Sequence, residues 1–433
     1  MIKDRFIVIA DILGFKNLIT DSSLLSLLDM FQALDKATAS PIITVSGNPE
    51  FVYDLMYKRD GQYEEIEEFE NKFEYALFSD TILMWFHPDQ NSNLWTFFSK
   101  LQGLFIASLN LNLPLRIGIA YGESYIDQEK SYFLGKAIVD AYVLEQNQNW
   151  VGACFHPSCF NSMAFDKVIQ DLFCVQEYQG VSKDGTAVIA FNWLSLLDNK
   201  NIRQILEKFL EPLSPQVFNK WLNTLTFIVQ HSKFHYLKIC PKTGVSTVSY
   251  FGSIEHLRKK SNQSRLEFLL SEQGDYRLLA HYLLAEIYLF GTNDLPPDQE
   301  RGLSYFKSSY ELGFKCAGTM YALNRIDEYP DENQWLKDNL NILEDCAMHD
   351  RTGAFPLGLH YLEGVKGLEK DLNKAEKYLE ESFLCYDFRS AGFLVSLYGL
   401  KQNLDARYQI KMLQMIAVVE MIINKATDLV KMR

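Results

Sequence analysis

The C-terminal part of the chain repeats itself, and this constrains its fold more than any other feature of the sequence. In residues 280–291 and 353–364, small residues, leucine, tyrosine and glycine recur at identical offsets. The tyrosines of these two copies, Tyr288 and Tyr361, are 73 residues apart, which is twice 36.5. A degenerate copy places Tyr321 near the midpoint, and a fourth copy places a tyrosine 37 residues after Tyr361. A period of 36–37 residues with small residues at the helix crossings is typical of an α/α solenoid, because one helical pair cannot bury its apolar face alone.

We therefore predict an all-helical solenoid over residues 265–433. The repeated residues resemble Sel1-like repeats, which are related to the tetratricopeptide repeat. The resemblance implies a scaffold that holds a protein partner, and the sequence does not identify that partner.

Residues 1–195 have a different pattern, in which short β-rich runs alternate with helical runs. This alternation predicts one sheet with helices packed on it. The expected strands are residues 6–10, 73–80, 81–86 and 115–120, and the expected helices are residues 24–37 and 94–109. The charged stretch 58–72 suggests a surface insertion. Residues 196–264 combine helical runs with a hairpin-like pair, 235–239 and 246–250, and we interpret them as a connecting region.

Composition limits the partners of such a protein. The 433 residues contain 42 Lys and Arg against 55 Asp and Glu, a formal charge of −13, so the chain lacks the positive field that holds duplex nucleic acid. It has no signal-peptide pattern and no apolar window long enough to span a membrane. Its seven cysteines are scattered, with no C-x-x-C pair, which indicates free thiols. We expect a cytoplasmic protein with no membrane partner.

An aspartate follows the first apolar strand directly. Placing the charge of Asp11 after residues 7–10 costs free energy unless the carboxylate is paired or binds a cation. Gly14 would allow close backbone approach, and the next helix would direct amide donors at whatever lies there. The alternative is that Asp11 caps the N-terminus of this helix.

A second aspartate lies between two apolar strands. Ser79 and Asp80 would form the tip of a hairpin, where aspartate is also common for conformational reasons alone. If Asp11 and Asp80 meet, they could bind a pair of Mg²⁺ or Mn²⁺ ions, because hard cations prefer carboxylate oxygens.

Two cations come later in the N-terminal part. Arg116 lies in the strand run 115–122 and is either a phosphate ligand or a solvated residue at a sheet edge. Lys136 follows Gly135 at the start of a helix and either attracts phosphate or is simply exposed.

Taken in chain order, the segments around Asp11, Asp80, Arg116 and Lys136 resemble the class III nucleotidyl cyclase catalytic domain. Residues 11–15, 78–82 and 135–145 are similar, more narrowly, to the bacterial cyclases of Pycsar anti-phage systems, which make cyclic CMP or cyclic UMP. The resemblance covers residues 1–195 and implies an α+β domain of the ferredoxin-like, palm type that works as a head-to-tail homodimer.

The resemblance also implies a role for each candidate residue. Two Mg²⁺ or Mn²⁺ ions would be held by Asp11, the carbonyl of Ile12, and Asp80. The nucleoside triphosphate would meet the amides of Leu13, Gly14 and Phe15, with Ser79 beside it and Phe73 and Tyr75 near the base. Arg116 and Lys136 would be the catalytic phosphate contacts.

The sequence departs from this family on the glycine-led helix. Class III cyclases carry Asn and Arg there, whereas residues 139–143 are Val-Asp-Ala-Tyr-Val. Ser79 also stands where adenylate cyclases have glycine. We therefore retain two hypotheses. The first is a cyclase that converts CTP or UTP to a 3′,5′-cyclic nucleotide and pyrophosphate. The second is a catalytically degenerate domain that serves, with the repeats, as an interaction scaffold.

Overall fold

The computed structural model describes residues 1–21, 23–39, 74–88, 94–178, 181–232, 268–292, 295–348, 351–364 and 368–431. The chain forms two compact units. One includes the N-terminal stretch with Tyr63–Lys208 and Leu213–Phe234, and the other includes His235–Arg433. The expected insertion 58–72 and the expected hairpin at 235–250 lie outside the described residues.

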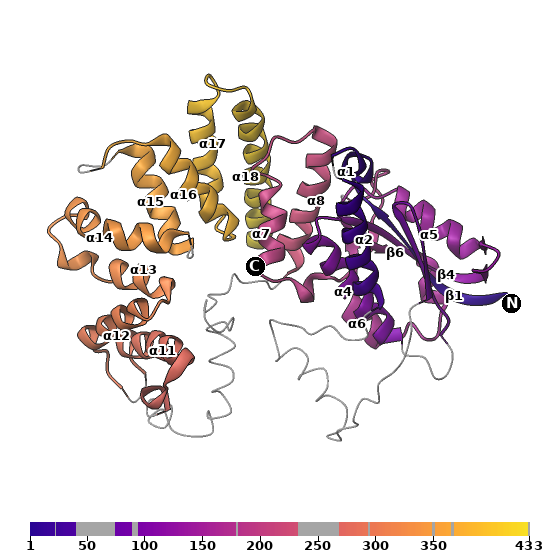
Figure 1. Ribbon diagram of the computed structural model, residues 1–433, viewed down its shortest axis with the longest axis horizontal. Coiled ribbons are helices and arrows are strands. Elements are labelled where there is room, and N and C mark those ends of the chain that lie inside the picture. The colour runs from indigo at the N-terminus through magenta and orange to yellow at the C-terminus, as the bar shows by residue number, and fades with distance from the viewer. Residues whose placement is uncertain are drawn as a thin grey trace. The chain divides into compact units, whose positions relative to one another are not determined.

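The first unit is built on an eight-stranded mixed sheet (Figure 1). Its strands are β1 (Lys3–Ile12), β2 (Glu74–Phe78), β3 (Thr81–Phe86), β4 (Leu115–Asp127), β5 (Tyr132–Leu134), β6 (Gly152–Phe155), β7 (Cys174–Tyr178) and β8 (Val188–Phe191). The order is β2-β3-β1-β4-β6-β8-β7, with β5 paired to β4. The β4–β6 pair is parallel, whereas the other neighbours in this order are antiparallel.

Seven helices of the described chain accompany this sheet. They are α1 (Phe15–Asp21), α2 (Leu24–Ala39), α4 (Leu94–Asn110), α5 (Lys136–Gln146), α6 (Lys167–Phe173), α7 (Asn199–Glu207) and α8 (Pro215–His231). The first described elements follow in the order β1-α1-α2-β2-β3-α4-β4, a β-α-β-β-α-β pattern with two helices in its first crossover, and β1 lies between β3 and β4. The strands and helices expected at 6–10, 24–37, 81–86, 94–109 and 115–120 are all confirmed, and β4 extends further than expected.

Strand β1 is apolar throughout its centre because helices cover both faces of the sheet. Ile7 and Ile9 pack in a cluster with Ala137 and Ala141 of α5. On the alternate positions, Phe6 meets Phe98 of α4, with ring centroids 5.7 Å apart. This alternation explains why residues 6–10 form a continuous apolar run.

Helix α5 lies very close to β4. A Cβ atom built on Gly118 would lie 2.1 Å from the Ala141 carbonyl oxygen, so only glycine allows this approach of the two backbones. The contact fixes where the residues of α5 lie along the strand.

The N-terminal unit extends beyond the boundary that we predicted at residue 195. In α8, the Thr224 hydroxyl accepts a hydrogen bond from Val151 N at 2.9 Å and lies 3.1 Å from Val151 O. The ring of Phe227 packs edge-on against Trp150, with centroids 4.9 Å apart. These contacts join distant parts of the chain, so local composition did not indicate them, and α7 and α8 belong to the N-terminal unit rather than to a connector.

The described part of the C-terminal unit is helical, as predicted. Its main helices are α11 (Arg277–Phe290), α12 (Gln299–Glu311), α13 (Lys315–Leu323), α14 (Glu332–Ala347), α15 (Arg351–Glu363), α16 (Leu372–Leu384), α17 (Arg389–Lys401) and α18 (Arg407–Lys431). They follow one another as helical pairs in Figure 1. No helix in the described ranges is both long and apolar enough to cross a membrane.

The repeated sequence signature marks the junction between two helices. Gly291 and Gly364 end α11 and α15 with φ angles of 71° and 74°, in the left-handed region that favours glycine. Seven residues later, the side chains of Asp298 and Asp371 accept hydrogen bonds from backbone amides in the first turn of α12 and α16. The repeated glycine and aspartate therefore correspond to a helix end and a helix cap, with a loop between them.

Candidate functional site

The two aspartates predicted to bind metal lie at the same end of the sheet. Asp11 is next to the last residue of β1 and faces Thr81 on one side and Arg116 on the other. Asp80 lies in the adjoining turn, where its carbonyl oxygen accepts a hydrogen bond of 2.9 Å from Ile12 N. Burial raises the pKa of Asp11, the nearby charge of Arg116 lowers it, and the negative charge of Asp80 raises it further. The negative charge of Asp80 thus disfavours the ionised form of Asp11.

The turn after β1 leaves open space at its glycine. Gly14 has a φ of 80°, and a Cβ atom there would meet no atom within 4 Å. Helix α1 begins at Phe15, so the alternative in which Asp11 caps this helix is wrong. In the described chain, the amides of Gly14 and Phe15 make no backbone hydrogen bond, whereas Leu13 N donates to Pro114 O at 2.9 Å. The Leu13 amide is therefore already occupied, unlike the other two predicted phosphate donors.

The β2–β3 turn keeps the conformation that glycine usually provides. Ser79 has a φ of 56°, in the left-handed region, so the serine is accommodated at a cost in backbone strain. Tyr75 is half-buried in β2, and its carbonyl accepts a hydrogen bond from Gln128 at 3.0 Å. Phe73, the other predicted base-pocket residue, lies outside the described residues.

Arg116 is buried in a network of charged groups. Its Nη2 lies 3.3 Å from the Asp11 carboxylate, Nη1 donates to Gln148 O at 3.3 Å, and Nε donates to Glu145. Arg116 is only 6% exposed, so the alternative of a solvated residue at a sheet edge is wrong. Its guanidinium holds Asp11 in place and partly neutralises it.

Glu145 completes this network from helix α5. Its side chain is 1% exposed, and burial raises its pKa while Arg116 lowers it. We did not predict a role for Glu145 from the sequence. The signal that could have found it is a carboxylate in the apolar face of α5, four residues after the buried Ala141.

Lys136 lies apart from these residues within one chain. It starts α5, where Gly135 packs against Glu123 and Ser124, whereas Glu145 and Arg116 lie at the opposite ends of α5 and β4. The Lys136 side chain is 81% exposed and forms an ion pair of 2.8 Å with Asp140. The geometry therefore does not bring Lys136 to Asp11 of the same chain.

The donor set near Asp11 suits a hard divalent cation. Two carboxylates and the Ile12 carbonyl are oxygen ligands, and Mg²⁺ commonly uses one or two carboxylates together with substrate phosphates. The described residues contain no cluster of three or more Asp, Glu, His or Cys side chains that could hold a metal alone. Oxygen atoms of a bound substrate or of water could complete the coordination of a metal held by Asp11 and Asp80.

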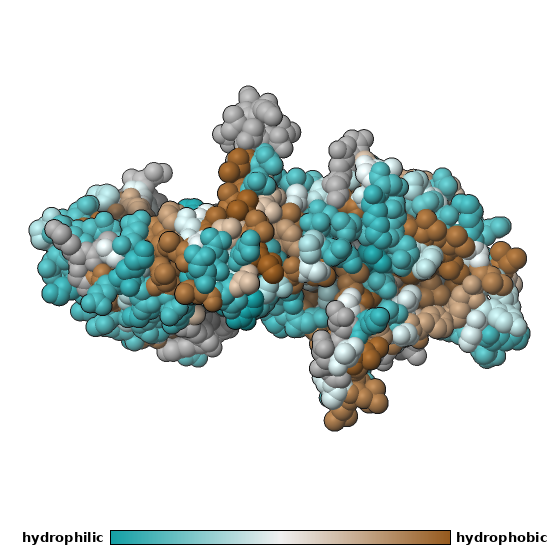
Figure 2. Space-filling model, turned by 90° about the horizontal axis from the view of Figure 1, so that it is seen from above, coloured by the Kyte–Doolittle hydropathy of each residue, from teal (hydrophilic) through white to brown (hydrophobic). Residues whose placement is uncertain are grey.

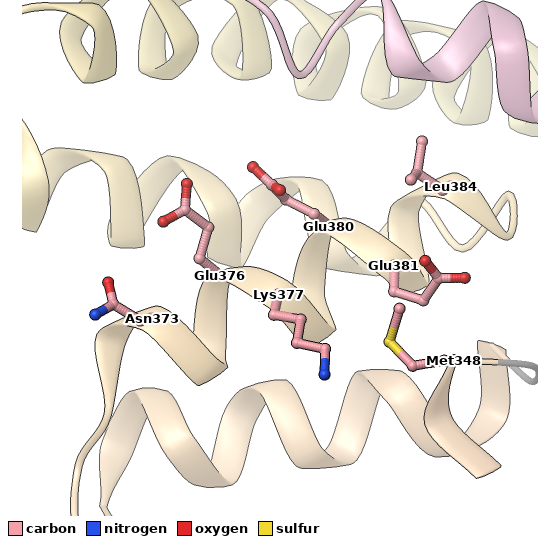
Figure 3. A pocket seen from close by; sticks show the side chains of 7 residues that line it. All are labelled: Met348, Asn373, Glu376, Lys377, Glu380, Glu381 and Leu384. Carbon is pink, nitrogen blue, oxygen red and sulfur yellow. The ribbon is translucent and has the colours of Figure 1, made fainter. Parts of the chain in front are cut away.

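The helical repeats contain a shallow pocket of about 360 Å³. Figure 3 shows that Glu376 and Glu380 leave α16 on one side, whereas Lys377 points to the other. Glu380 accepts a hydrogen bond of 2.6 Å from Tyr398 and pairs with Lys411 at 2.9 Å. The remaining lining residues are Met348, Asn373, Glu376, Lys377, Glu381 and Leu384. Its acidic groups are thus partly used in holding neighbouring repeats together.

Similarity to known proteins is found for the helical repeats. The Sel1 repeat model matches residues 278–314 and 353–383. A solved structure of a protective antigen from uropathogenic Escherichia coli strains, which displays an SLR fold, is similar at 15% identity with a TM-score of 0.28. The match covers 49% of this chain and 51% of that chain. A search of curated proteins finds no match. The family-model match identifies Sel1 repeats in the C-terminal region of this chain.

Proposed function

We propose that the N-terminal unit is a nucleotide cyclase that converts CTP or UTP to a 3′,5′-cyclic nucleotide and pyrophosphate. The observation that carries this proposal is the placement of Asp11 and Asp80 on adjacent strand ends, joined by the 2.9 Å hydrogen bond from Ile12 N to Asp80 O. The strand order β2-β3-β1-β4 and the β-α-β-β-α-β sequence support the ferredoxin-like, palm-type fold that the cyclase resemblance implies.

In this reaction the 3′-oxygen of the nucleotide attacks the α-phosphorus, and the bond from that phosphorus to the bridging oxygen of pyrophosphate breaks. Two Mg²⁺ or Mn²⁺ ions, when bound, would lower the pKa of the 3′-hydroxyl and neutralise charge on the phosphates. Asp11, Asp80 and the Ile12 carbonyl would hold these ions. Arg116 would orient Asp11, so in one chain it acts as a positioning residue rather than a direct phosphate ligand.

The turn after β1 would bind the phosphates. A Cβ atom on Gly14 would meet no atom within 4 Å, and the left-handed Gly14 shapes the turn so that a charged ligand would approach the Gly14 and Phe15 amides. Tyr75 would lie near the base. The choice between cytosine and uracil rests on the family resemblance alone.

We also propose that the enzyme is a head-to-tail homodimer. Large apolar side chains are exposed on β5 and α5: Tyr132, Leu134, Val139, Tyr142 and Val143 are each 52–60% exposed. Figure 2 shows one face of the molecule, on which apolar areas lie between polar ones. A contact through the exposed side of β5 and α5 would bury these five side chains and would allow Lys136 of one copy to serve the site of the other.

The test is an assay of the purified chain with each of the four nucleoside triphosphates and Mn²⁺, with products identified by mass spectrometry. We expect a cyclic pyrimidine nucleotide, and loss of the product in Asp11→Asn and Asp80→Ala. Asp171→Asn is the matched control, because this carboxylate is exposed on α6 and pairs only with Lys167 among the described residues. A folded dimer that makes no cyclic product from any nucleotide would refute the enzyme proposal.

The second candidate is a degenerate cyclase-like scaffold. It is favoured by the outer side of α5, where Val139, Tyr142 and Val143 are exposed and no arginine is present. In this case the repeats would bind a protein partner while the N-terminal unit still binds nucleotide or metal. Metal-dependent nucleotide binding without turnover would support this second candidate.

A further inference from the structure

Helix α8 packs against residues 149–151, which lead into β6, although it follows the segment that resembles a cyclase. Asn223 Nδ2 donates to Asn149 O at 2.8 Å, and Thr224 is bonded to both backbone groups of Val151. The next residue, Gly152, is paired with Arg116 across β6 and β4. Arg116 is in turn paired with Asp11 across β4 and β1. These contacts place residues 220–224 of α8 beside the row of residues that contains the candidate site.

Lys220 lies one turn before Thr224 in this helix, and its carbonyl accepts the Thr224 hydroxyl at 2.9 Å. Its side chain is half-buried. Burial, Arg116 and Lys183 lower the pKa of Lys220, whereas Asp11 and Glu145 raise it, so its ammonium lies within the electrostatic range of all four groups.

The ammonium of Lys220 makes no hydrogen bond or ion pair with any residue that the structure describes. The neighbouring charges are already paired: Arg116 binds both Asp11 and Glu145, and Lys183 Nζ donates to Gln146 O at 2.6 Å. A half-buried cation with no partner is unfavourable on its own, but it is favourable where an anionic ligand binds.

We propose that Lys220 binds the phosphates of a nucleoside triphosphate held at Asp11 and Asp80. This inference rests on the proposed function and extends it, because it assigns a substrate contact to a helix outside the cyclase-like segment. Lys220 supplies a positive charge in a chain whose α5 has no arginine, and it is available because it is not used by the Asp11–Arg116–Glu145 network.

The experiment compares the full-length protein with Lys220→Gln, Lys220→Met and Lys220→Arg. Binding of Mn²⁺ alone is measured by electron paramagnetic resonance. Binding of α,β-methylene CTP and UTP with Mn²⁺ is measured by calorimetry, since these analogues cannot be cleaved at the bond that cyclisation breaks. Lys200→Gln, which removes an exposed lysine from α7, is the control, and thermal unfolding shows that each variant is folded.

We expect Lys220→Gln and Lys220→Met to weaken binding of the Mn²⁺–nucleotide by about tenfold or more. Mn²⁺ alone should bind as tightly as before or more tightly, because a positive charge near Asp11 is lost. Lys220→Arg should retain most of the nucleotide affinity. Weaker nucleotide binding without weaker Mn²⁺ binding separates a phosphate contact from a merely structural role, which would weaken both.

Weaker binding of both Mn²⁺ and the nucleotide would overturn the inference, and so would two further results, which are distinguishable. If the wild-type protein binds the nucleotide and makes cyclic product while Lys220→Gln and Lys220→Met bind as tightly, Lys220 is no phosphate ligand and the cyclase proposal stands. If the wild-type protein binds neither analogue and makes no product, both proposals fail together.

Discussion

Replacing Arg116 by methionine tests whether the buried charges at the sheet end are as tightly coupled as their geometry implies. The Arg116 side chain is 8% exposed and the Glu145 side chain 1%, so the variant would leave a buried carboxylate without its cation. Breaking such a pair costs about 3–5 kcal/mol of the free energy of unfolding. The lost contacts to Asp11 and Gln148 act in the same direction.

The cost should depend on pH in a defined direction. Burial already raises the pKa of Glu145, and Arg116 opposes this, so the pKa rises further in Arg116→Met. A carboxyl whose folded-state pKa is raised binds protons better in the folded state than in the unfolded state. The variant's stability therefore falls as pH rises from the unfolded value of about 4.3 to the raised folded value, by about 1.4 kcal/mol for each pKa unit of the shift.

Urea unfolding followed by tryptophan fluorescence measures this effect. Of the six tryptophans, only Trp335 lies in the C-terminal unit, so the signal reports mainly on the N-terminal unit. Arg116→Met should be much less destabilised near pH 5 than near pH 8. Because Asp11 also responds to Arg116, the double variant Arg116→Met with Glu145→Gln isolates the contribution of Glu145.

The double variant should recover about 2 kcal/mol relative to Arg116→Met at pH 8, because the unpaired charge is gone. Lys136→Met removes an exposed cation and is the control, with an expected change within about 0.5 kcal/mol. A loss below about 1 kcal/mol for Arg116→Met, or a loss that is equal at both pH values, would refute the reasoning.

Two further predictions concern packing in each unit. Gly118→Ala should destabilise the N-terminal unit by about 1–3 kcal/mol, because the new Cβ would lie 2.1 Å from Ala141 O. The same urea assay should show a lower unfolding midpoint. An unchanged midpoint would mean that α5 is not held against β4. Glu344→Gln should lower the stability of the repeats by about 0.5–1 kcal/mol, because Glu344 accepts hydrogen bonds from Tyr361 at 2.6 Å and from Lys374 at 3.1 Å at a partly exposed site. Faster hydrogen exchange confined to α14–α16 would agree with this, and unaltered exchange there would contradict it.

The repeats were predictable from the sequence because their signals are local. The glycine that ends α11 or α15 and the aspartate that caps α12 or α16 lie seven residues apart, so one short pattern marks each junction. The contact between successive pairs is also regular. Tyr361 and Tyr398 each donate to a glutamate of the preceding pair, Glu344 or Glu380, although the glycine is absent from the last copy.

The candidate site was only partly predictable, for a physical reason. Asp11 and Asp80 interrupt apolar strands, and an unexplained charge beside a buried run is visible in one sequence. The partners of Asp11 are not visible in this way. Arg116 lies 105 residues after it and Glu145 a further 29, and they meet only because β1 and α5 both pack against β4.

The difference between local signals and contacts between distant residues also matters for whether the N-terminal unit is active. The arginine that class III cyclases carry is missing from one helix, α5. Its absence indicates loss of catalysis only if no other element supplies a cation at the sheet end. Helix α8 brings Lys220 there, fixed by Thr224 and Asn223, from a segment whose sequence gave no sign of belonging to the site. For deciding whether this unit is active, the position of the charged groups is thus a better criterion than the family motif. Asp80→Ala tests whether the carboxylates act in the reaction. Lys220→Gln tests whether a cation from α8 replaces the arginine that is missing from α5.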